Sequence, residues 1–352
     1  MKIFEKIAHS YQKKTPFVAY RKPNADIVSG FFMDTDVLFY SEDFSEKGFV
    51  FAPFDNQQKA VLFPEETSEF ISEELSFAPL NFKESVFSAA ADSKDYHMQL
   101  VNKTIEEIIK NDLKKVVIGR KEVLEIAELN LIKVYQKLLQ TYSNAFVYVW
   151  YHPKIGLWLG ATPETLLSID NAIFKTMSLA GTQVYQNTKK VVWKSKELEE
   201  QQLVTDFIER QLKEISSNLK IDKKETIKAG SLLHLSTKFT GVLNENSTLK
   251  TLIRALHPTP AVCGFPRRNA KKFILENEQY DRSFYTGFLG ELNMKMHEKT
   301  AISSCMFVNL RCMNIDKNKV SIFVGGGITE ESIAEKEWEE TVSKSQIMKR
   351  VL

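Results

Sequence analysis

The chain contains 352 residues, enough for one large domain or two ordinary ones. Hydrophobic residues make up 43% and charged residues 26%, which are globular values that exclude collagen-like, coiled-coil and disordered chains. Lys and Arg total 47 and Asp and Glu total 45, and the basic residues are spread along the chain. The sequence therefore predicts no nucleic-acid partner, whereas a small anionic substrate is compatible with it.

The three cysteines are Cys263, Cys305 and Cys312, and no CxxC pair occurs. This odd count argues against a disulfide framework and against a structural zinc site. It favours a reducing compartment such as the cytoplasm. The N-terminal segment has no apolar signal-peptide core, and no stretch approaches the roughly 20 apolar residues that span a membrane. We therefore expect a cytoplasmic protein without a membrane partner.

The N-terminal portion, residues 1–95, is predicted to be rich in strands and to pack into the same fold as the rest of the chain. Polar turns separate the predicted strands, which lie at 17–20, 37–40, 48–54 and 59–63. A small, polar run follows at 88–95, and its composition is typical of a linker or of a loop.

From residue 96 onward the apolar residues take helical spacing. Met98, Val101, Ile105 and Ile108 predict a helix that ends near Asn111. Further helices are predicted at 131–139, 197–219 and 332–352. Further strands are predicted at 115–118, 145–150, 156–159, 166–169, 236–242, 287–294, 301–310 and 320–324. Strands and a few long helices without regular βαβ alternation indicate an α+β fold.

Two of these helices carry carboxylates on a face that continues into apolar residues. In the helix at 197–219, Glu197 and Glu200 share one stripe with Val204 and Phe207. The stripe predicts that both carboxylates point toward the core. The alternative is a solvated acidic helix start, which the helix dipole favours.

The last helix repeats this pattern, since Glu337, Glu340 and Lys344 share a stripe with Ile347 and Val351. The alternative here is a surface ion pair between Glu340 and Lys344 at i, i+4. Four inward carboxylates on two helices cannot stay buried without cations. Hard oxygen ligands from one or two carboxylates, completed by water and substrate, suit Mg²⁺. The two helices together predict a magnesium site.

A lysine and a glutamate are candidates for acid–base chemistry. Lys114 and Lys115 are adjacent on a predicted strand, so one of them points inward if one face is core. A desolvated lysine can serve as a general base, and the alternative is an edge lysine that reaches water. Glu164 lies in a rigid turn beside Leu166, where apolar neighbours would raise its pKa and make it an acid. The alternative is an exposed turn residue.

Glycines and an arginine are candidate anion contacts. The glycine run at 325–327 follows a predicted strand and can offer backbone N–H groups to an anion. The alternative is a tight turn. Neither this run nor residues 180–182 have the spacing of a nucleotide-binding loop. Arg311, through its bidentate guanidinium, and Tyr285 can hold a carboxylate.

Ten strings between residues 97 and 352 resemble the chorismate-utilising enzyme family, in the family's order. This family includes isochorismate synthase, salicylate synthase, anthranilate synthase component I and aminodeoxychorismate synthase. The matching strings are KVVIGR (115–120), GATPETLL (160–167), LAGT (179–182), KELEEQQLV (196–204), HLST (234–237), LHPTPAVCGFP (256–266), DRSFYTGFLGE (281–291), NLRC (309–312), VGGGI (324–328) and EKEWEETVSK (335–344).

The resemblance implies that residues 96–352 form a chorismate-binding catalytic domain of α+β class. In this fold, large antiparallel sheets enclose a cleft and helices pack outside. The family precedent also implies a monomer.

The resemblance further implies roles for single residues. Mg²⁺ would lie mainly on Glu200 and Glu340, with Glu197 and Glu337 supporting it through water, and would neutralise a carboxylate of chorismate. The residues implied to bind the substrate are Tyr285, Arg311, Lys344, Gly325, Gly326 and Gly327 at its carboxylates and Gly181, Thr182, His234 and Thr259 at its ring.

Two residues decide which member of the family is implied. Lys115 stands where the water-using members carry a lysine, and Glu164 stands at the position of the acid. A base and an acid suit attack of water at C2 while the C4 hydroxyl leaves with a proton. The match therefore favours a Mg²⁺-dependent isochorismate synthase that feeds menaquinone or siderophore biosynthesis. Salicylate synthase, which adds pyruvate elimination, is an alternative, and an ammonia-using anthranilate synthase component I is a more distant one.

Three positions depart from the family pattern. Gly119 stands where serine is more usual, Gly326 stands where alanine is common, and residues 201–202 replace a pair that contains histidine. None of these departures removes a catalytic group. Gly119 is expected to loosen the strand near Lys115.

Overall fold

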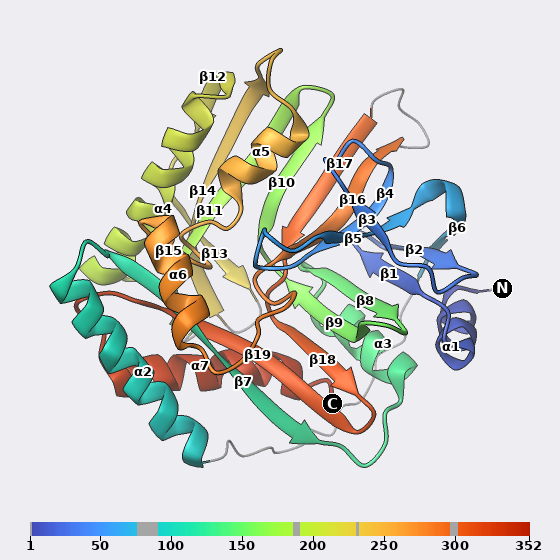
Figure 1. Ribbon diagram of the computed structural model, residues 1–352, viewed down its shortest axis with the longest axis horizontal. Helices are drawn as coiled ribbons and strands as arrows, with labels where there is room; N and C mark the ends of the chain where they lie inside the picture. The colour runs from blue at the N-terminus through green and yellow to red at the C-terminus, as the bar shows by residue number, and fades with distance from the viewer. Residues whose placement is uncertain (1, 76–90, 186–190, 230–231, 296–301) are drawn as a thin grey trace.

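Two large antiparallel sheets pack against each other, and helices cover their outer sides (Figure 1). The structure is a computed structural model, and it describes residues 2–75, 91–185, 191–229, 232–295 and 302–352. The predicted α+β class, with large antiparallel sheets and outer helices, is confirmed. Within the described ranges, no helix has the length and apolar character needed to cross a membrane.

The first sheet has nine strands in the order β15-β7-β19-β18-β9-β8-β1-β2-β6. Its strands are Phe17–Arg21 (β1), Ile27–Met33 (β2), Ser68–Glu74 (β6), Lys115–Glu125 (β7), Phe146–His152 (β8), Gly156–Thr162 (β9), Gly264–Phe265 (β15), Cys312–Asp316 (β18) and Lys319–Ile328 (β19).

The second sheet follows the order β12-β14-β11-β10-β17-β16-β4-β5-β3, and β13 pairs with β14 beside this path. Its strands are Phe39–Ser41 (β3), Gly48–Ala52 (β4), Ala60–Pro64 (β5), Thr165–Asp170 (β10), Ile173–Val184 (β11), Ser216–Ile221 (β12), Glu225–Ala229 (β13), Leu232–Leu243 (β14), Phe288–Lys295 (β16) and Ile302–Val308 (β17).

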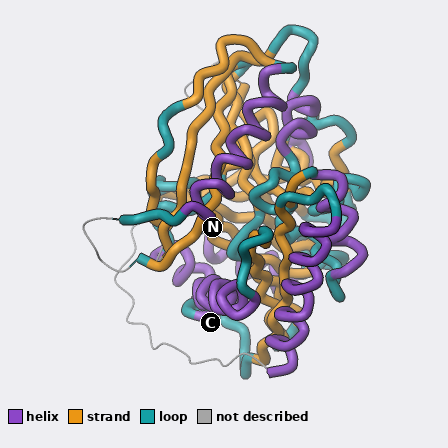
Figure 2. The backbone as a smooth tube through the Cα atoms, turned by 90° about the vertical axis from the view of Figure 1, so that its left-hand side faces the viewer, coloured by secondary structure: helices purple, strands orange, loops and turns teal. Residues whose placement is uncertain are grey.

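The helices pack on the outer faces of the sheets (Figure 2). They are Ile3–Lys13 (α1), Ala91–Lys110 (α2), Leu131–Thr141 (α3), Ser195–Lys213 (α4), Leu249–Leu256 (α5), Arg267–Asn277 (α6) and Ala334–Lys349 (α7), with a short 3-10 turn at Glu65–Thr67. Most of them bury one apolar stripe against a sheet, whereas α7 also buries polar side chains. Helices α1 and α3 cover the first sheet, α4 and α5 cover the second, and α2 and α6 pack against β7.

Strands from the first 75 residues belong to both sheets. β1 lies between β8 and β2, with Phe17 opposite Tyr151, and β4 pairs with β16, with Phe51 opposite Leu289. In Figure 1 the blue N-terminal strands accordingly lie beside strands from the middle and the end of the chain.

Aromatic side chains fill the space between the two sheets. Phe146 from β8 and Phe307 from β17 stack with ring centroids 4.2 Å apart, which joins the sheets directly. Trp150 from β8 meets Phe51 from β4 edge-on at 5.3 Å. Offset and edge-to-face contacts of this kind add to the burial of large apolar surface, so this layer stabilises the packing of one sheet on the other.

Four helices differ from the sequence-based prediction, because α1, α5 and α6 were not predicted and the helix predicted at 197–219 is shorter. Helix α1 was not predicted, although Ile3 and Ile7 bury one face of it against the first sheet. The helix predicted at 197–219 ends at Lys213, and a strand, β12, begins at Ser216. Serine and asparagine at 216–218 are weak helix formers, which favours the strand.

The polar run at 88–95 is not a linker throughout. Residues 91–95 form the start of α2, and residues 88–90 lie outside the described residues.

Gly119 on β7 leaves room for an aromatic side chain. A Cβ at this position would overlap the hydroxyl of Tyr280, whose ring lies beside Phe323 of β19. Among the described residues, the Tyr280 hydroxyl has no hydrogen-bond partner. The glycine therefore accommodates the large neighbour.

We expect Gly119→Ser to destabilise the fold by about 1–3 kcal/mol, because overpacking forces buried side chains out of their preferred positions. Adding Tyr280→Phe removes the overlapping oxygen and should restore most of the lost free energy of unfolding. Urea titration of the wild type, both single variants and the double variant measures the effect. Equal destabilisation by Gly119→Ser in both backgrounds would contradict this account.

Candidate functional site

The pocket that most of the predicted residues line lies where strands of both sheets meet helices α4 and α7. Its non-atom space is about 700 Å³, of which a large part is open to solvent. Most of the predicted site residues line it, namely Glu164, Gly181, Thr182, Glu200, His234, Tyr285, Arg311, Gly325, Gly326, Gly327, Glu340 and Lys344. The pocket lining does not include Lys115, Glu197, Glu337 or Thr259.

Lys115 lies behind the pocket wall, in an ion pair with Glu200. Its side chain has no exposed surface, whereas Lys114 is exposed, as strand alternation requires. The Nζ of Lys115 lies 2.7 Å from Oε1 of Glu200. Gly327 on β19 makes room for the pair, because a Cβ there would lie 2.6 Å from Oε1 of Glu200 and 2.7 Å from Cε of Lys115.

The two carboxylates that line the pocket from the helices each have a lysine partner. Burial raises the pKa of Glu200, but the ammonium of Lys115, together with the charges of Lys344 and Lys196, outweighs burial and leaves this pKa below its ordinary value. Oε1 of Glu340 lies 2.6 Å from Nζ of Lys344, which also donates to the carbonyl of Gly325 at 2.8 Å.

Glu337 and Glu197, which the resemblance implies to support the metal, lie in different surroundings. Glu337 is buried and forms an ion pair with Lys196 of α4. Burial and the neighbouring Glu340 raise the pKa of Glu337, although Lys196 opposes them. Glu197 instead accepts a hydrogen bond at 3.0 Å from the N–H of Lys194 at the start of its own helix. Lys196 was not predicted, although its i, i+4 spacing from Glu200 was a usable signal.

The donor chemistry of Glu200 and Glu340 fits Mg²⁺. Both offer hard oxygen ligands, and both line one pocket although they come from different helices. Within the ranges that the structure describes, no group of three or more His, Cys, Asp or Glu side chains is placed to hold a metal. Mg²⁺ is commonly bound by one or two carboxylates together with water and ligand oxygens.

Glu164 follows β9 and is almost fully buried at the pocket. Burial raises its pKa from 4.5 to about 8, even though Lys115 and Arg311 lower it. The carboxyl group therefore stays protonated near neutral pH and can donate a proton, which a carboxyl of ordinary pKa cannot do.

Arg311 reaches the pocket from a turn between β17 and β18. Its backbone takes a positive φ of 46°, which is uncommon for a residue with a Cβ. The N–H of Ala161 donates to the Arg311 carbonyl at 2.9 Å and holds this turn. Among the described residues, one terminal guanidinium nitrogen, Nη1, has no hydrogen-bond partner. This buried donor is suited to an anionic ligand.

His234 on β14 lies next to Arg311 and is neutral. Burial, followed by the charges of Arg311 and Lys344, lowers the pKa of His234 to about 3. Its Nδ1 lies 3.1 Å from the carbonyl of Gly181, which can only accept, so the proton lies on Nδ1. Nε2 then offers a lone pair toward Nη2 of Arg311 at 3.5 Å.

Gly181 and Tyr285 shape the pocket walls. Gly181 has a φ of 71° at a bulge in the pairing of β11 with β14, and a Cβ there would lie 3.2 Å from the Glu197 carbonyl. The ring of Tyr285 stacks on Phe323, with centroids 5.6 Å apart. Burial raises the pKa of Tyr285 above its ordinary value, so its hydroxyl remains a donor.

Thr259 lies just outside the pocket lining. Its carbonyl accepts hydrogen bonds from the N–H groups of Val262 and Cys263, which closes the loop that follows α5. Ala261 and Val262 of this loop line the pocket. The structure thus brings the loop to the site through residues other than Thr259.

The departures at Gln201 and Gly326 do not change the polar groups of the pocket. Gln201 is fully buried and lies outside the pocket lining, and its Nε2 is within hydrogen-bond distance of the hydroxyls of Ser178, Thr205 and Thr237. A Cβ at Gly326 would lie 3.3 Å from Oε2 of Glu337, so an alanine would need only a small shift.

The apolar part of the pocket was largely missed by sequence reasoning. It consists of Val117, Pro163, Leu179, Ala180, Ala261, Val262, Leu310, Phe323 and Val324, and Thr286 adds a hydroxyl. Strand alternation could have found Val117, which lies two residues after Lys115. The others come together only through tertiary packing.

A family model described as chorismate binding enzyme matches residues 53–352. The chain belongs to the chorismate-binding enzyme family. This confirms the resemblance that the ten strings indicate. The match includes both acidic helices, the strand that carries Lys115 and the turn that carries Glu164.

Individual relatives agree with this assignment. Isochorismate synthase EntC from Escherichia coli (strain K12) is 29% identical over 317 residues, which cover 85% of this chain and 79% of that protein. The vibriobactin-specific isochorismate synthase of Vibrio cholerae is 28% identical over 276 residues, covering 75% and 67%. The solved structure of MenF, the menaquinone-specific isochorismate synthase from Escherichia coli, has the same fold, with a TM-score of 0.83 at 21% identity and coverage of 100% and 91%.

We expect Glu164 to make stability depend on pH. Because its pKa rises from 4.5 to about 8 on folding, the folded protein holds a proton that the unfolded chain releases between these pH values. The contribution of Glu164 to the free energy of unfolding is fully present below pH 4.5 and is lost as the pH rises toward 8.

Glu164→Gln keeps the shape but cannot ionise. The free energy of unfolding of this variant should therefore increase relative to that of the wild type as the pH rises through this window. Urea titrations at several pH values measure the difference. A difference that stays constant across the window would show that Glu164 titrates normally.

Proposed function

We propose that this protein is an isochorismate synthase, an isomerase that interconverts chorismate and isochorismate with Mg²⁺ as cofactor. One observation carries the proposal. A buried carboxyl with a raised pKa, Glu164, lines the same pocket that a fully buried lysine, Lys115, approaches from behind. Addition of water with loss of a hydroxyl group requires one acid and one base. The isochorismate synthases among the relatives support this function.

The substrate's negative charges would be met by cationic and neutral donors of the pocket. Arg311 offers a buried guanidinium nitrogen without a protein partner among the described residues, and Tyr285 offers a neutral hydroxyl. Lys344 and the backbone at 325–327 line the same wall. Burial in a low-dielectric pocket strengthens such charge-assisted hydrogen bonds to a carboxylate.

Glu200 and Glu340 would hold Mg²⁺, with Glu197 and Glu337 nearby. When bound, the ion would neutralise a substrate carboxylate. The two helices bring these carboxylates to one pocket, and this placement supports the assignment.

In the proposed reaction the neutral Lys115 amine accepts a proton from water as the oxygen bonds to C2 of the ring. The ring double bonds shift, the C4–O bond breaks, and Glu164 gives its proton to the departing oxygen. One water enters and one water leaves, so atoms and charge balance. In the reverse direction the same two groups act with their roles exchanged.

Incubation of the purified protein with chorismate and Mg²⁺, followed by chromatography, tests the function. Isochorismate as the product supports the proposal. Salicylate with pyruvate would indicate salicylate synthase, and anthranilate formed with ammonia would indicate the third family activity. The names of the relatives suggest that the product enters menaquinone or siderophore biosynthesis. We further propose that the protein is a cytoplasmic monomer.

Lys115→Ala is expected to lower kcat about 10²–10⁴-fold, because positioned proton transfer typically contributes this factor. Steady-state rates in both directions measure it. Lys114→Ala is a matched control, since the neighbouring lysine is exposed on the opposite strand face. Near-normal turnover of Lys115→Ala in both directions would make this lysine structural.

Glu340→Gln is expected to raise the Mg²⁺ concentration needed for half-maximal activity, because an amide oxygen is a weaker ligand than a carboxylate for a hard cation. Titration of activity with MgCl₂ measures the change. Glu339→Gln, on the exposed face of the same helix, should leave the titration unchanged. Identical Mg²⁺ titrations for the wild type and Glu340→Gln would remove Glu340 from the metal site.

A further inference from the structure

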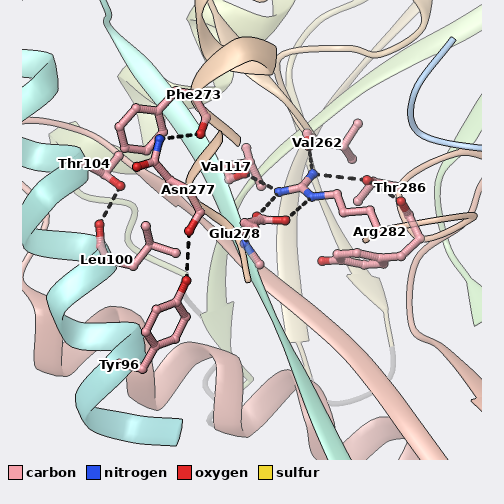
Figure 3. Close-up of polar contacts among 12 residues, drawn as sticks. Tyr96, Leu100, Thr104, Val117, Val262, Phe273, Asn277, Glu278, Arg282 and Thr286 are labelled. Atoms are coloured by element: carbon pink, nitrogen blue, oxygen red, sulfur yellow. Dashed lines mark hydrogen bonds and ion pairs between the residues drawn. The ribbon is translucent and has the colours of Figure 1, made fainter. Parts of the chain in front are cut away.

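A buried ion pair outside the pocket, Arg282 with Glu278, connects several of the pocket's walls (Figure 3). Both side chains are only 2% exposed, and neither lines the pocket. The Nε of Arg282 donates to Oε2 of Glu278 at 2.7 Å, and Nη2 donates to Oε1. This bidentate arrangement fixes the orientation of the guanidinium plane.

The remaining donors of Arg282 reach three other segments of the chain. Nη2 donates to the carbonyl of Val117 on β7 at 2.7 Å, and Nη1 donates to the carbonyl of Val262 at 3.0 Å. Nη1 also donates to Oγ1 of Thr286 at 3.2 Å. All five N–H donors of the guanidinium are therefore used. Val117, Val262 and Thr286 each line the substrate pocket.

Glu278 adds a second bond to the strand that carries Lys115. Its Oε1 accepts a hydrogen bond from the N–H of Gly119 at 2.6 Å. The pair thus holds β7 at two points, the Val117 carbonyl and the Gly119 N–H. Lys115 and Val117 lie on the same face of this strand, so the placement of β7 also sets the placement of the proposed base.

We propose that Arg282 and Glu278 are a positioning pair that sets the spacing of β7, the loop at 259–263 and the segment at 285–286 around the substrate. The proposal rests on the proposed function, since the walls that it positions are those of the chorismate pocket. A lysine at 282 could not replace the arginine, because an ammonium lacks the planar fork that reaches four partners at once.

A pair that only stabilises the fold and a pair that positions the pocket are expected to respond differently to substitution. Removing one partner of a buried ion pair leaves an unpaired buried charge and lowers stability strongly. Removing both charges avoids that penalty. If the pair acts only through stability, activity should return together with stability in the double variant. If the pair positions the pocket, stability should return without full activity.

The experiment compares the wild type, Arg282→Met, Glu278→Gln and the double variant, by urea unfolding and by steady-state kinetics with chorismate and Mg²⁺. The Glu278→Gln substitution keeps an acceptor for the Gly119 N–H, so the double variant loses mainly the bridges made by Arg282. We expect it to be more stable than Arg282→Met, yet to have a kcat/KM about 10- to 100-fold below the wild type, mainly through KM.

Glu291→Gln is a control for loss of a buried carboxylate away from the pocket. Glu291 is buried on β16, where its carboxylate accepts hydrogen bonds from Tyr20 and Lys22. None of the three residues lines the pocket. This variant should lose stability and keep the wild-type KM. A double variant with wild-type kcat/KM would overturn the positioning role.

Hydrogen exchange separates failure of this inference from failure of the proposed function. Faster amide exchange at residues 115–119 and 285–286 in the double variant, with unchanged exchange in α1 and α3, supports positioning whatever the substrate proves to be. Unchanged exchange in those pocket segments would overturn it. If the wild-type protein makes no isochorismate, the proposed function fails, and the exchange data still decide the role of the pair.

Discussion

The ion pair between Lys115 and Glu200 is the constraint around which the site is built. A fully buried ammonium is tolerated only with a carboxylate partner, and that partner comes from α4. The helix must therefore lie close to β19, where Gly327 leaves room for both side chains. Apolar residues of equal volume would often be at least as stable as such a pair. Its presence at the wall of a pocket therefore favours a chemical role over a stabilising one.

The same pocket holds carboxyl groups in different protonation states. Glu200 is ionised because a lysine contacts it, whereas Glu164 stays protonated because burial outweighs the more distant charges of Lys115 and Arg311. The identity of the side chain is the same in both cases, and the contacts decide its chemistry. Neutral His234 contributes in a similar way, since it offers Arg311 a lone pair without adding a second positive charge.

Periodicity predicted much of this arrangement, and tertiary contacts supplied the rest. The helical stripes at Glu200 and Glu340 and the alternation at Lys115 were visible in the sequence, because each depends on a local repeat. The role of Arg282 and Glu278 was not found, although they lie four residues apart, since the groups that they bridge come from distant segments of the chain. Helix α1 was missed because the surrounding strand signals dominated that region. The resemblance to a family located residues that no local pattern could bring together.

The position of the N-terminal strands has a consequence for how the chain assembles during synthesis. β1 occupies an interior place in the first sheet, between β2 and β8, and β4 pairs with β16 near the other end of the chain. Such distant pairings are slow to form, because the entropy cost of closing a long loop comes before the stabilising contacts are made. On the ribosome, β4 can pair with β5 early, but it can pair with β16 only after most of the chain has emerged. Until then the other edge of β4, which carries no charged residue, is open to pairing with other chains.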